Sequence, residues 1–119
     1  MIWIAVFIGG GLGSVCRFAI AHFLSRWVWM SFPFATVLTN AAASFILGYL
    51  TLYGSNHLSK ELQAAWMIGF CGGFSTFSTF TAENAYLLQN GSYLSLSINI
   101  LLSVVICLLF FFLGMKLAS

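Results

Sequence analysis

The sequence predicts an all-α membrane protein in which four helices cross the bilayer. Three observations support this: 61% of the 119 residues are hydrophobic, only 5% are charged, and the apolar residues fall into long runs. An ordinary soluble domain is about one-quarter charged. A hydrocarbon core of about 30 Å needs about 20 apolar residues per helical crossing. We therefore expect a single transmembrane domain, residues 1–119, with short loops.

Short polar or aromatic stretches separate the four predicted helices. The helices are expected at residues 2–24, 33–53, 62–89 and 92–117. Arg26 and Trp29 follow the first, and a cation with an amphipathic ring suits a water interface. Pro33 opens the second, because proline is tolerated in the first turn of a helix. The stretch 54–61 is strongly polar and is expected to be a loop.

The third predicted helix contains the stretch where we expect the helix to break. Its middle, from Gly69 to Phe80, reads GFCGGFSTFSTF, so paired glycines precede a run of hydroxyl side chains. Non-helical backbone persists inside a bilayer only where protein or a wet cavity satisfies its amides. A break near residues 71–76 would expose backbone groups of the kind that transporters use to hold ions. The alternative is an unbroken helix whose glycines allow close packing.

Each of the other three helices carries a stripe of small and polar residues that recurs every four positions. The stripes are Ala5, Gly9, Gly13, Arg17 and Ala21; Thr36, Asn40, Ser44 and Gly48; and Ser95, Asn99, Ser103 and Cys107. Because a helix has 3.6 residues per turn, each stripe is one slowly winding face. Small residues let helices approach closely, and polar residues avoid lipid. We expect the stripes to face the protein interior.

The loop charges are too few to fix one orientation in the membrane. Four crossings would place Arg26 on one side and Lys60 and Lys116 on the other, a weak bias. A chain that inserts both ways up can pair with an inverted copy of itself. We therefore expect an antiparallel, dual-topology homodimer. Its two broken helices would meet at the centre, where facing carbonyls could bind a cation such as sodium; direct helix packing is the alternative.

Composition argues against several other functions. The net charge is +2, and four Lys and Arg residues do not make the basic patch that nucleic-acid binding requires. Cys16, Cys71 and Cys107 are widely spaced in apolar stretches and do not suggest a disulfide framework or a metal site. No residues suggest a nucleophile with a base and an orienting acid, so we predict that the protein is not an enzyme.

A few residues inside the predicted membrane region are candidates for an ion path. Phe77 and Phe80 share one helical face after the break, and their ring edges could attract an anion. The alternative is that the two rings only pack against neighbouring helices. Because Asn40 is expected inside the membrane, its side-chain amide needs a hydrogen-bond partner, which is either a group on another helix or a passing anion. Arg17 either lines an anion vestibule or snorkels to the interface. For Glu83 we favour a structural role.

The segment from Gly69 to Phe80 resembles the signature of the small bacterial fluoride channels, the Fluc or CrcB family. The resemblance covers about residues 8–95. Matching residues on the first two helices are Gly9, Gly10, Gly13, Arg17, Pro33, Thr36, Asn40 and Gly48. The resemblance implies an antiparallel homodimer with two narrow pores. These pores would pass fluoride passively out of the cell, across the bacterial inner membrane.

The resemblance also implies roles for individual residues. Along the ion path it places Asn40, Phe77, Phe80, Ser78, Thr79, Ser103 and Cys107. The carbonyls of Gly72 and Ser75 would bind a structural sodium ion, and Arg17 would line the aqueous vestibule. Fluoride holds its water tightly, so compact donors and ring edges must replace that water, and a narrow bore must reject chloride. A thiol is a weak donor, so Cys107 departs from the hydroxyl usual at its position.

Two other classes of protein also have to be weighed. A small multidrug exporter of similar size needs a carboxylate deep in its first helix, where this chain has Arg17 and no acid. A non-transporting membrane scaffold would not need a glycine-rich break flanked by interleaved phenylalanines and hydroxyl residues.

Overall fold

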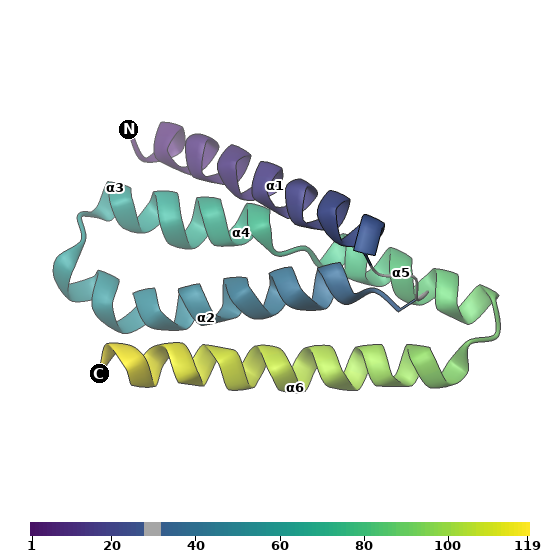
Figure 1. The fold of residues 1–119 in the computed structure, drawn as a ribbon. Coiled ribbons are helices and arrows are strands. Elements are labelled where there is room, and N and C mark those ends of the chain that lie inside the picture. The colour runs from purple at the N-terminus through teal and green to yellow at the C-terminus, as the bar shows by residue number, and fades with distance from the viewer. Residues whose placement is uncertain (28–31) are drawn as a thin grey trace.

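The described part of the chain is helical apart from short connections. The computed structural model describes residues 1–27 and 32–119, so the predicted interfacial Trp29 lies outside the described residues. The elements are α1 Ile2–Trp27, α2 Phe34–His57, α3 Lys60–Gln63, the π-helix η1 Ala64–Phe70, α4 Cys71–Phe74, α5 Phe77–Gln89 and α6 Tyr93–Ala118. No strand occurs among the described residues, in agreement with the predicted all-α class (Figure 1).

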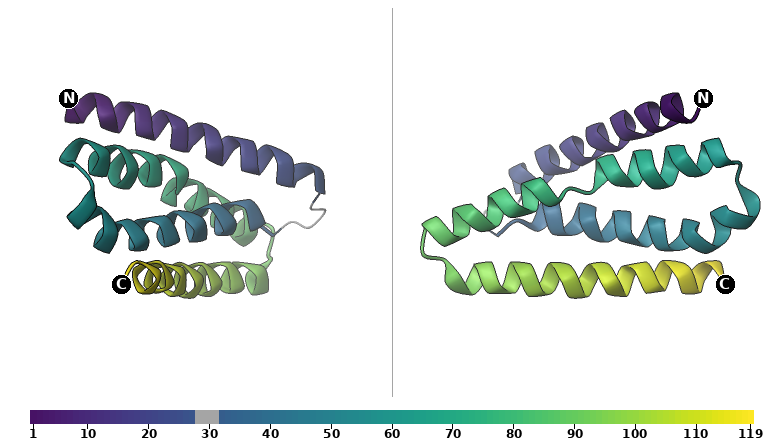
Figure 2. Two further views of the ribbon diagram at one scale, coloured as in Figure 1. Left: turned by 60° about the vertical axis from the view of Figure 1, so that its left-hand side comes forward. Right: turned by 180° about the vertical axis from the view of Figure 1, so that it is seen from behind.

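The long helices pack in two pairs. α2 packs against α6, and α1 packs against η1 and α4 (Figures 1 and 2). The α3, η1 and α4 segments form one continuous helical run, since Gln63 and Cys71 at its junctions keep right-handed helical angles. Both termini and the connection from α2 to α3 lie at one end of the molecule, and the turn between α5 and α6 lies at the other (Figure 1).

The bounds of α2 differ most from the prediction. The helix continues past residue 53 to His57, through residues that were predicted to form a loop. In this last turn Ser55 Oγ donates to the Leu52 carbonyl at 3.0 Å, so the Ser55 hydroxyl finds its partner within the helix. Two residues then separate α2 from α3. The polar stretch is therefore mostly helical.

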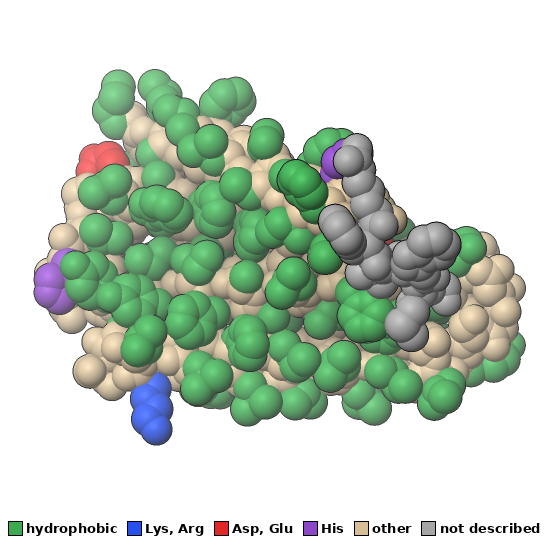
Figure 3. Space-filling view, viewed as in Figure 1, with side chains coloured by type: hydrophobic (Ala, Val, Ile, Leu, Met, Phe, Trp, Pro, Cys, Tyr) green, Lys and Arg blue, Asp and Glu red, His purple; other side chains and the backbone are tan. Residues whose placement is uncertain are grey.

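Three helices in the described part of the chain are long and apolar enough to cross a membrane. They are Ile2–Ser25, Phe34–His57 and Tyr93–Ala118. Figure 3 shows one face of the molecule largely covered by hydrophobic side chains. The third predicted helix is divided into residues 60–74 and 77–89, each shorter than one crossing, which needs about 20 residues. The chain is therefore a multi-pass membrane protein with three uninterrupted candidate spans, where the sequence predicted four crossings.

Glycines in the predicted inward stripes bring helix backbones into contact. A Cβ atom at Gly9 would collide with the carbonyl oxygen of Ala65, so α1 and η1 pack with no room for a side chain. A Cβ at Gly48 would collide in the same way with the Phe111 carbonyl of α6. Small residues permit this close packing inside membranes. The α1 stripe does not stay inward to its end, because Ala21 is exposed.

An extended segment of Ser75 and Thr76, which we call the interruption, separates α4 from α5. Their φ and ψ angles are −91° and 155° at Ser75 and −152° and 126° at Thr76. Gly72 and Gly73, expected to break the helix, are helical within α4. Gly73 instead lets α4 approach α1, because a Cβ there would collide with the Gly10 carbonyl. The glycines therefore serve close packing, and the extended residues follow them.

Side chains from α1 and α2 bind the backbone at the interruption. Thr76 N–H donates to Asn40 Oδ1 at 2.9 Å, and Asn40 Nδ2 donates to the Thr76 carbonyl at 3.4 Å. Arg17 Nε donates to the Gly73 carbonyl at 3.1 Å. Thr76 Oγ1 accepts from the Thr79 N–H at 3.3 Å and caps α5. These bonds replace those that a continuous helix would make.

Enlarging a contact glycine should destabilise the helix pair that it joins. Gly9→Ala would press a methyl group against the Ala65 carbonyl, and overpacking of this kind costs about 1–3 kcal/mol. Gly11→Ala is the matched control, because a Cβ at Gly11 would meet nothing within 4 Å beyond its own helix. Thermal unfolding in detergent micelles should show a lower midpoint for Gly9→Ala alone. Equal midpoints for the two variants would contradict the packing of α1 against η1.

Removing the Asn40 amide should destabilise the interruption. Asn40→Leu keeps the size of the side chain but takes away both partners of the Thr76 backbone, and a buried group without a partner costs about 1–3 kcal/mol. Asn56→Leu is the control, since Asn56 is exposed and bonds only within α2, and its effect should stay within about 0.5 kcal/mol. Unfolding midpoints measure both changes. An Asn40→Leu protein as stable as wild type would show that the interruption does not depend on this pair.

Candidate functional site

An open groove of about 300 Å³ lies where α2, α5 and α6 meet at the interruption. Its lining residues are Asn40, Ser44, Ser75, Thr76, Phe77, Phe80, Ser103, Val104 and Cys107. Five of the residues that the sequence placed along an ion path therefore gather at one surface, from three different helices. Aromatic rings, an amide, hydroxyls and a thiol line the groove together.

The two phenylalanines of the groove lie against each other. The ring centroids of Phe77 and Phe80 are 5.7 Å apart and their planes differ by 11°, so the rings are stacked. Ring edges carry the positive part of the aromatic quadrupole. Phe77 is 82% exposed. A single chain therefore leaves this ring pair at a surface and covers the groove from one side.

Asn40 finds its partner at the interruption. It bonds to both backbone groups of Thr76, so the interhelical bond considered from the sequence is present. A side-chain amide has two donor hydrogens, and the Thr76 carbonyl takes one of them. Asn40 can therefore hold the interruption in place and donate to a ligand in the groove at the same time.

The α6 side of the groove is lined by Ser103 and Cys107. The Ser103 side chain is 7% exposed, and its Oγ donates to Asn99 Oδ1 at 3.3 Å. Asn99 Nδ2 in turn donates to Asn84 Oδ1 of α5 at 2.7 Å. Cys107 lies one turn beyond Ser103, is partly buried and forms no disulfide. The α6 wall is therefore polar at Ser103 and only weakly so at Cys107.

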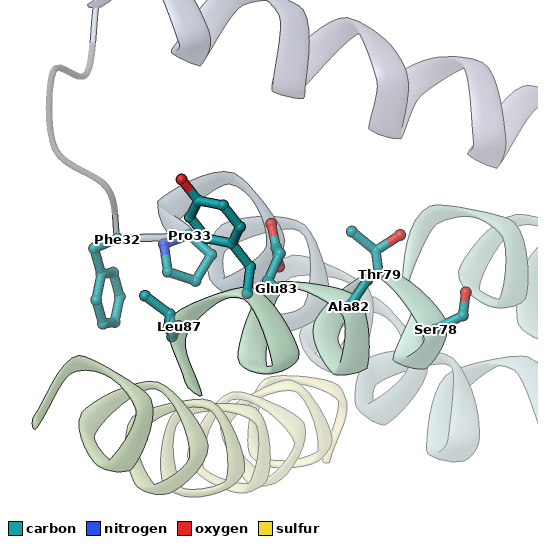
Figure 4. Close-up of a pocket in the computed structure, with 8 residues that line it drawn as sticks. Phe32, Pro33, Ser78, Thr79, Ala82, Glu83 and Leu87 are labelled. Carbon is teal, nitrogen blue, oxygen red and sulfur yellow. The ribbon is translucent and has the colours of Figure 1, made fainter. Parts of the chain in front are cut away.

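Ser78 and Thr79 lie apart from this groove, in a second and larger hollow of about 650 Å³. Figure 4 shows Ser78, Thr79 and Glu83 following one another along α5, with Pro33 nearer to Glu83 than to Ser78. Successive helix positions point about 100° apart, so these hydroxyls cannot share the face of Phe77 and Phe80. Thr76 Oγ1 lies within hydrogen-bond distance of both, 3.1 Å from Ser78 Oγ and 3.3 Å from Thr79 Oγ1. Thr76 therefore connects the two hollows.

Arg17 and Glu83 line the same small cavity of about 90 Å³. Glu83 Oε2 accepts from Thr36 Oγ1 at 2.9 Å, which links α5 to α2. Its Oε1 is buried and has no hydrogen-bond partner among the described residues. Arg17 is partly buried and uses Nε on the Gly73 carbonyl, while a guanidinium has four further N–H donors. Arg17 therefore binds the end of α4, and Glu83 joins two helices.

Gly72 and Ser75 line a third hollow, of about 160 Å³, on the other side of the interruption. The Thr76 N–H, which a continuous helix would aim at the Gly72 carbonyl, donates to Asn40 instead. A Cβ at Gly72 would meet no atom within 4 Å, so the space beside it is open. Carbonyl oxygens of this kind suit a hard cation. Both residues that the resemblance assigns to the sodium ion therefore line one hollow, and the ion itself stays a prediction.

Three residues that line these hollows or bond to the α6 wall of the groove were not predicted to take part in the site. Thr76 holds Asn40 through its backbone, Ser44 lines the groove, and Asn84 binds Asn99. Asn84 follows Phe80 by four positions, so it lies on the same helical face one turn later. That spacing was the available signal for Asn84. A backbone role, as in Thr76, leaves no signature in the side chain.

Comparisons with known proteins identify the family. The chain matches the family profile described as "CrcB-like protein, Camphor Resistance (CrcB)" over residues 4–115. A relative from Pyrococcus abyssi named "Fluoride-specific ion channel FluC" is 45% identical over 115 residues, which are 93% of this chain and 90% of the relative. A protein of the same name from Shewanella baltica strain OS185 is 40% identical over 94% of this chain and 91% of its own length. One from Methylococcus capsulatus is 38% identical over 96% of this chain and 51% of its own length. These matches reach into every described helix, and the chain belongs to the CrcB family.

Proposed function

We propose that this chain is a fluoride-selective channel that lets fluoride leave the cell passively and so lowers its cytoplasmic concentration. The proposal rests on one arrangement: Phe77 and Phe80 line one groove together with Asn40 and Ser103, and the two rings are stacked there. The relatives named fluoride-specific ion channels support the choice of ion. Membership of this family also makes the protein a channel rather than an enzyme.

The chemistry of the groove suits a small, strongly hydrated anion. Fluoride loses its water only where compact donors replace it, and amide and hydroxyl groups are such donors. Positive ring edges add attraction without adding a fixed charge that would hold the ion too tightly. Arg17, in the small cavity beside the interruption, adds positive charge near the approach. Chloride is larger, and a bore formed between close rings would exclude it.

The segment from α3 to α5 is proposed as a fourth, interrupted membrane crossing. Both termini lie at the same end of the molecule, which requires an even number of crossings (Figure 1). The three uninterrupted spans make an odd number, so the segment between α2 and α6 has to supply the fourth. The interruption would then lie within the membrane. Its backbone groups avoid lipid there because Asn40 and Arg17 bind them.

An antiparallel, dual-topology homodimer is proposed as the conducting form. One chain leaves Phe77 82% exposed and its groove open, so a second surface has to complete the pore. Two symmetric grooves would make two pores. The carbonyls of Gly72 and Ser75 from both copies would hold a sodium ion between them, supplying oxygen ligands that one chain lacks. The proposed location is the plasma membrane, which is the inner membrane of a bacterium.

Passive fluoride flux tests the function directly. Protein reconstituted in liposomes loaded with potassium fluoride should release fluoride to an external electrode once a potassium ionophore is added, without a pH gradient. Liposomes without protein are the first control, and chloride-loaded liposomes, which should retain their anion, are the second. A proton-coupled exporter would need the gradient, and a scaffold would release nothing. Either of those results would exclude the proposed channel.

The two phenylalanines should be indispensable for flux but not for assembly. Phe77→Ile and Phe80→Ile remove the ring edges and should nearly abolish fluoride efflux, while the gel-filtration profile stays that of wild type. Phe112→Ile is the matched control, because Phe112 lies on α6 outside the groove, is 60% exposed, and its replacement should leave flux unchanged. Normal efflux in both groove variants would refute the role of the ring edges.

Dual topology should be visible by labelling. In a chain with Cys16, Cys71 and Cys107 replaced by serine, Ser55→Cys lies at one end of the molecule and Asn90→Cys at the other. A membrane-impermeant maleimide applied to sealed vesicles should label about half of the protein at either position, because antiparallel pairing places equal numbers of chains each way up. Labelling of one variant in full and of the other not at all would mean a single orientation.

A further inference from the structure

Two buried polar side chains, Asn99 and Ser103, and the half-buried Asn84 form a hydrogen-bonded chain that ends at the groove, and we call these three residues the α5–α6 relay. Asn84 Oδ1 accepts from Asn99 Nδ2 at 2.7 Å, and Asn99 Oδ1 accepts from Ser103 Oγ at 3.3 Å. Asn99 is 2% exposed and Ser103 is 7% exposed. Ser103 is the only member of the relay that lines the groove of Phe77 and Phe80.

The relay couples the directions of its dipoles. An amide buried in a membrane protein is costly unless both of its ends are bonded, and both ends of Asn99 are bonded here. Asn84 presents its acceptor oxygen, so Asn99 turns its donor end to Asn84 and its acceptor end to Ser103. Turning the Asn99 amide over alone would set two acceptors against each other at Asn84. In the arrangement that the structure has, Asn84 therefore orients Asn99, and Asn99 orients Ser103.

This orientation determines what Ser103 offers to an anion. A serine hydroxyl has one hydrogen, and in this structure that hydrogen points to Asn99. The lone pairs of Ser103 then face the groove, where they repel a negative ion. Rotation of the hydroxyl would turn the hydrogen toward an ion beside Phe77 and Phe80. An anion entering the groove thus competes with Asn99 for one hydrogen.

We propose that Asn84 and Asn99 are positioning residues for the Ser103 hydroxyl, which alternates between Asn99 and a fluoride ion in the groove. Asn99 takes the hydrogen when no ion is present, so Ser103 donates only in passing and does not trap the ion. Without Asn99 the hydroxyl would turn to the backbone carbonyl one turn earlier, as serine does in helices, and would be lost to the ion path. The inference rests on the proposed fluoride channel.

A double-mutant comparison in the liposome efflux assay tests this role. Asn99→Leu should lower the rate of fluoride efflux about 3- to 20-fold, the range that corresponds to interhelical hydrogen bonds in membranes. In a Ser103→Ala background the same change should have no further effect, because the hydroxyl on which Asn99 acts is absent. In a Ser103→Thr background, which keeps a hydroxyl, the loss should return. An equal loss in all three backgrounds would show that Asn99 acts through packing alone and would overturn the proposal.

A second variant and a control make the outcome decisive. Asn84→Leu leaves the bond between Asn99 and Ser103 possible, so it should lower efflux less than Asn99→Leu and also lose its effect in the Ser103→Ala background. If the Asn99→Leu protein does not fold, as judged by gel filtration, Asn84→Leu takes its place in the comparison. Ser97→Ala, an exposed change on α6, should match wild type. Absence of fluoride flux in wild type would reject the channel itself, whereas additive losses in a conducting protein would reject only the relay.

Discussion

The structure depends on how the backbone at Ser75 and Thr76 is satisfied. Lipid offers no hydrogen bonds, so in the proposed fourth crossing these two extended residues need partners from the protein. Asn40 binds both backbone groups of Thr76, and Arg17 binds the carbonyl at the end of α4. The groove and the open carbonyls beside it exist only because these partners allow the helix to stop and restart.

Close helix packing brings those partners within reach. Gly73 on α4 touches the backbone of α1 at Gly10, and Arg17 follows two turns later on α1, where it reaches the end of α4. Gly48 makes a similar contact with α6, so α2 and α6 lie close enough for Asn40 and Ser103 to line one groove. The small residues thus determine how closely the helices approach. This close approach lets the polar residues reach the neighbouring helices.

Local patterns in the sequence were sufficient for the long apolar helices and for the pairing of Phe77 with Phe80, since spacing along one helix decides both. They predicted a break within residues 71–76, a range that includes the extended Ser75 and Thr76, but attributed it to paired glycines that are helical in the structure. The extended residues come later, where Asn40, 36 positions away, supplies a bond that no local pattern contains. Non-local contacts also determine that Ser103 points at Asn99 and that Asn84 joins them.

In the proposed channel, affinity for an anion and selectivity by size would arise at different levels of the structure. The donors and ring edges are fixed within one chain by Asn99, Thr76 and the packing of α2 against α6. A pore that rejects a larger ion has to surround the smaller one, and one chain bounds its groove from a single side, with Phe77 largely exposed. The surface that closes the groove therefore sets its width. A variant that weakened only that surface would keep the donors in place. It would lose selectivity between small and large anions before it lost affinity for an anion.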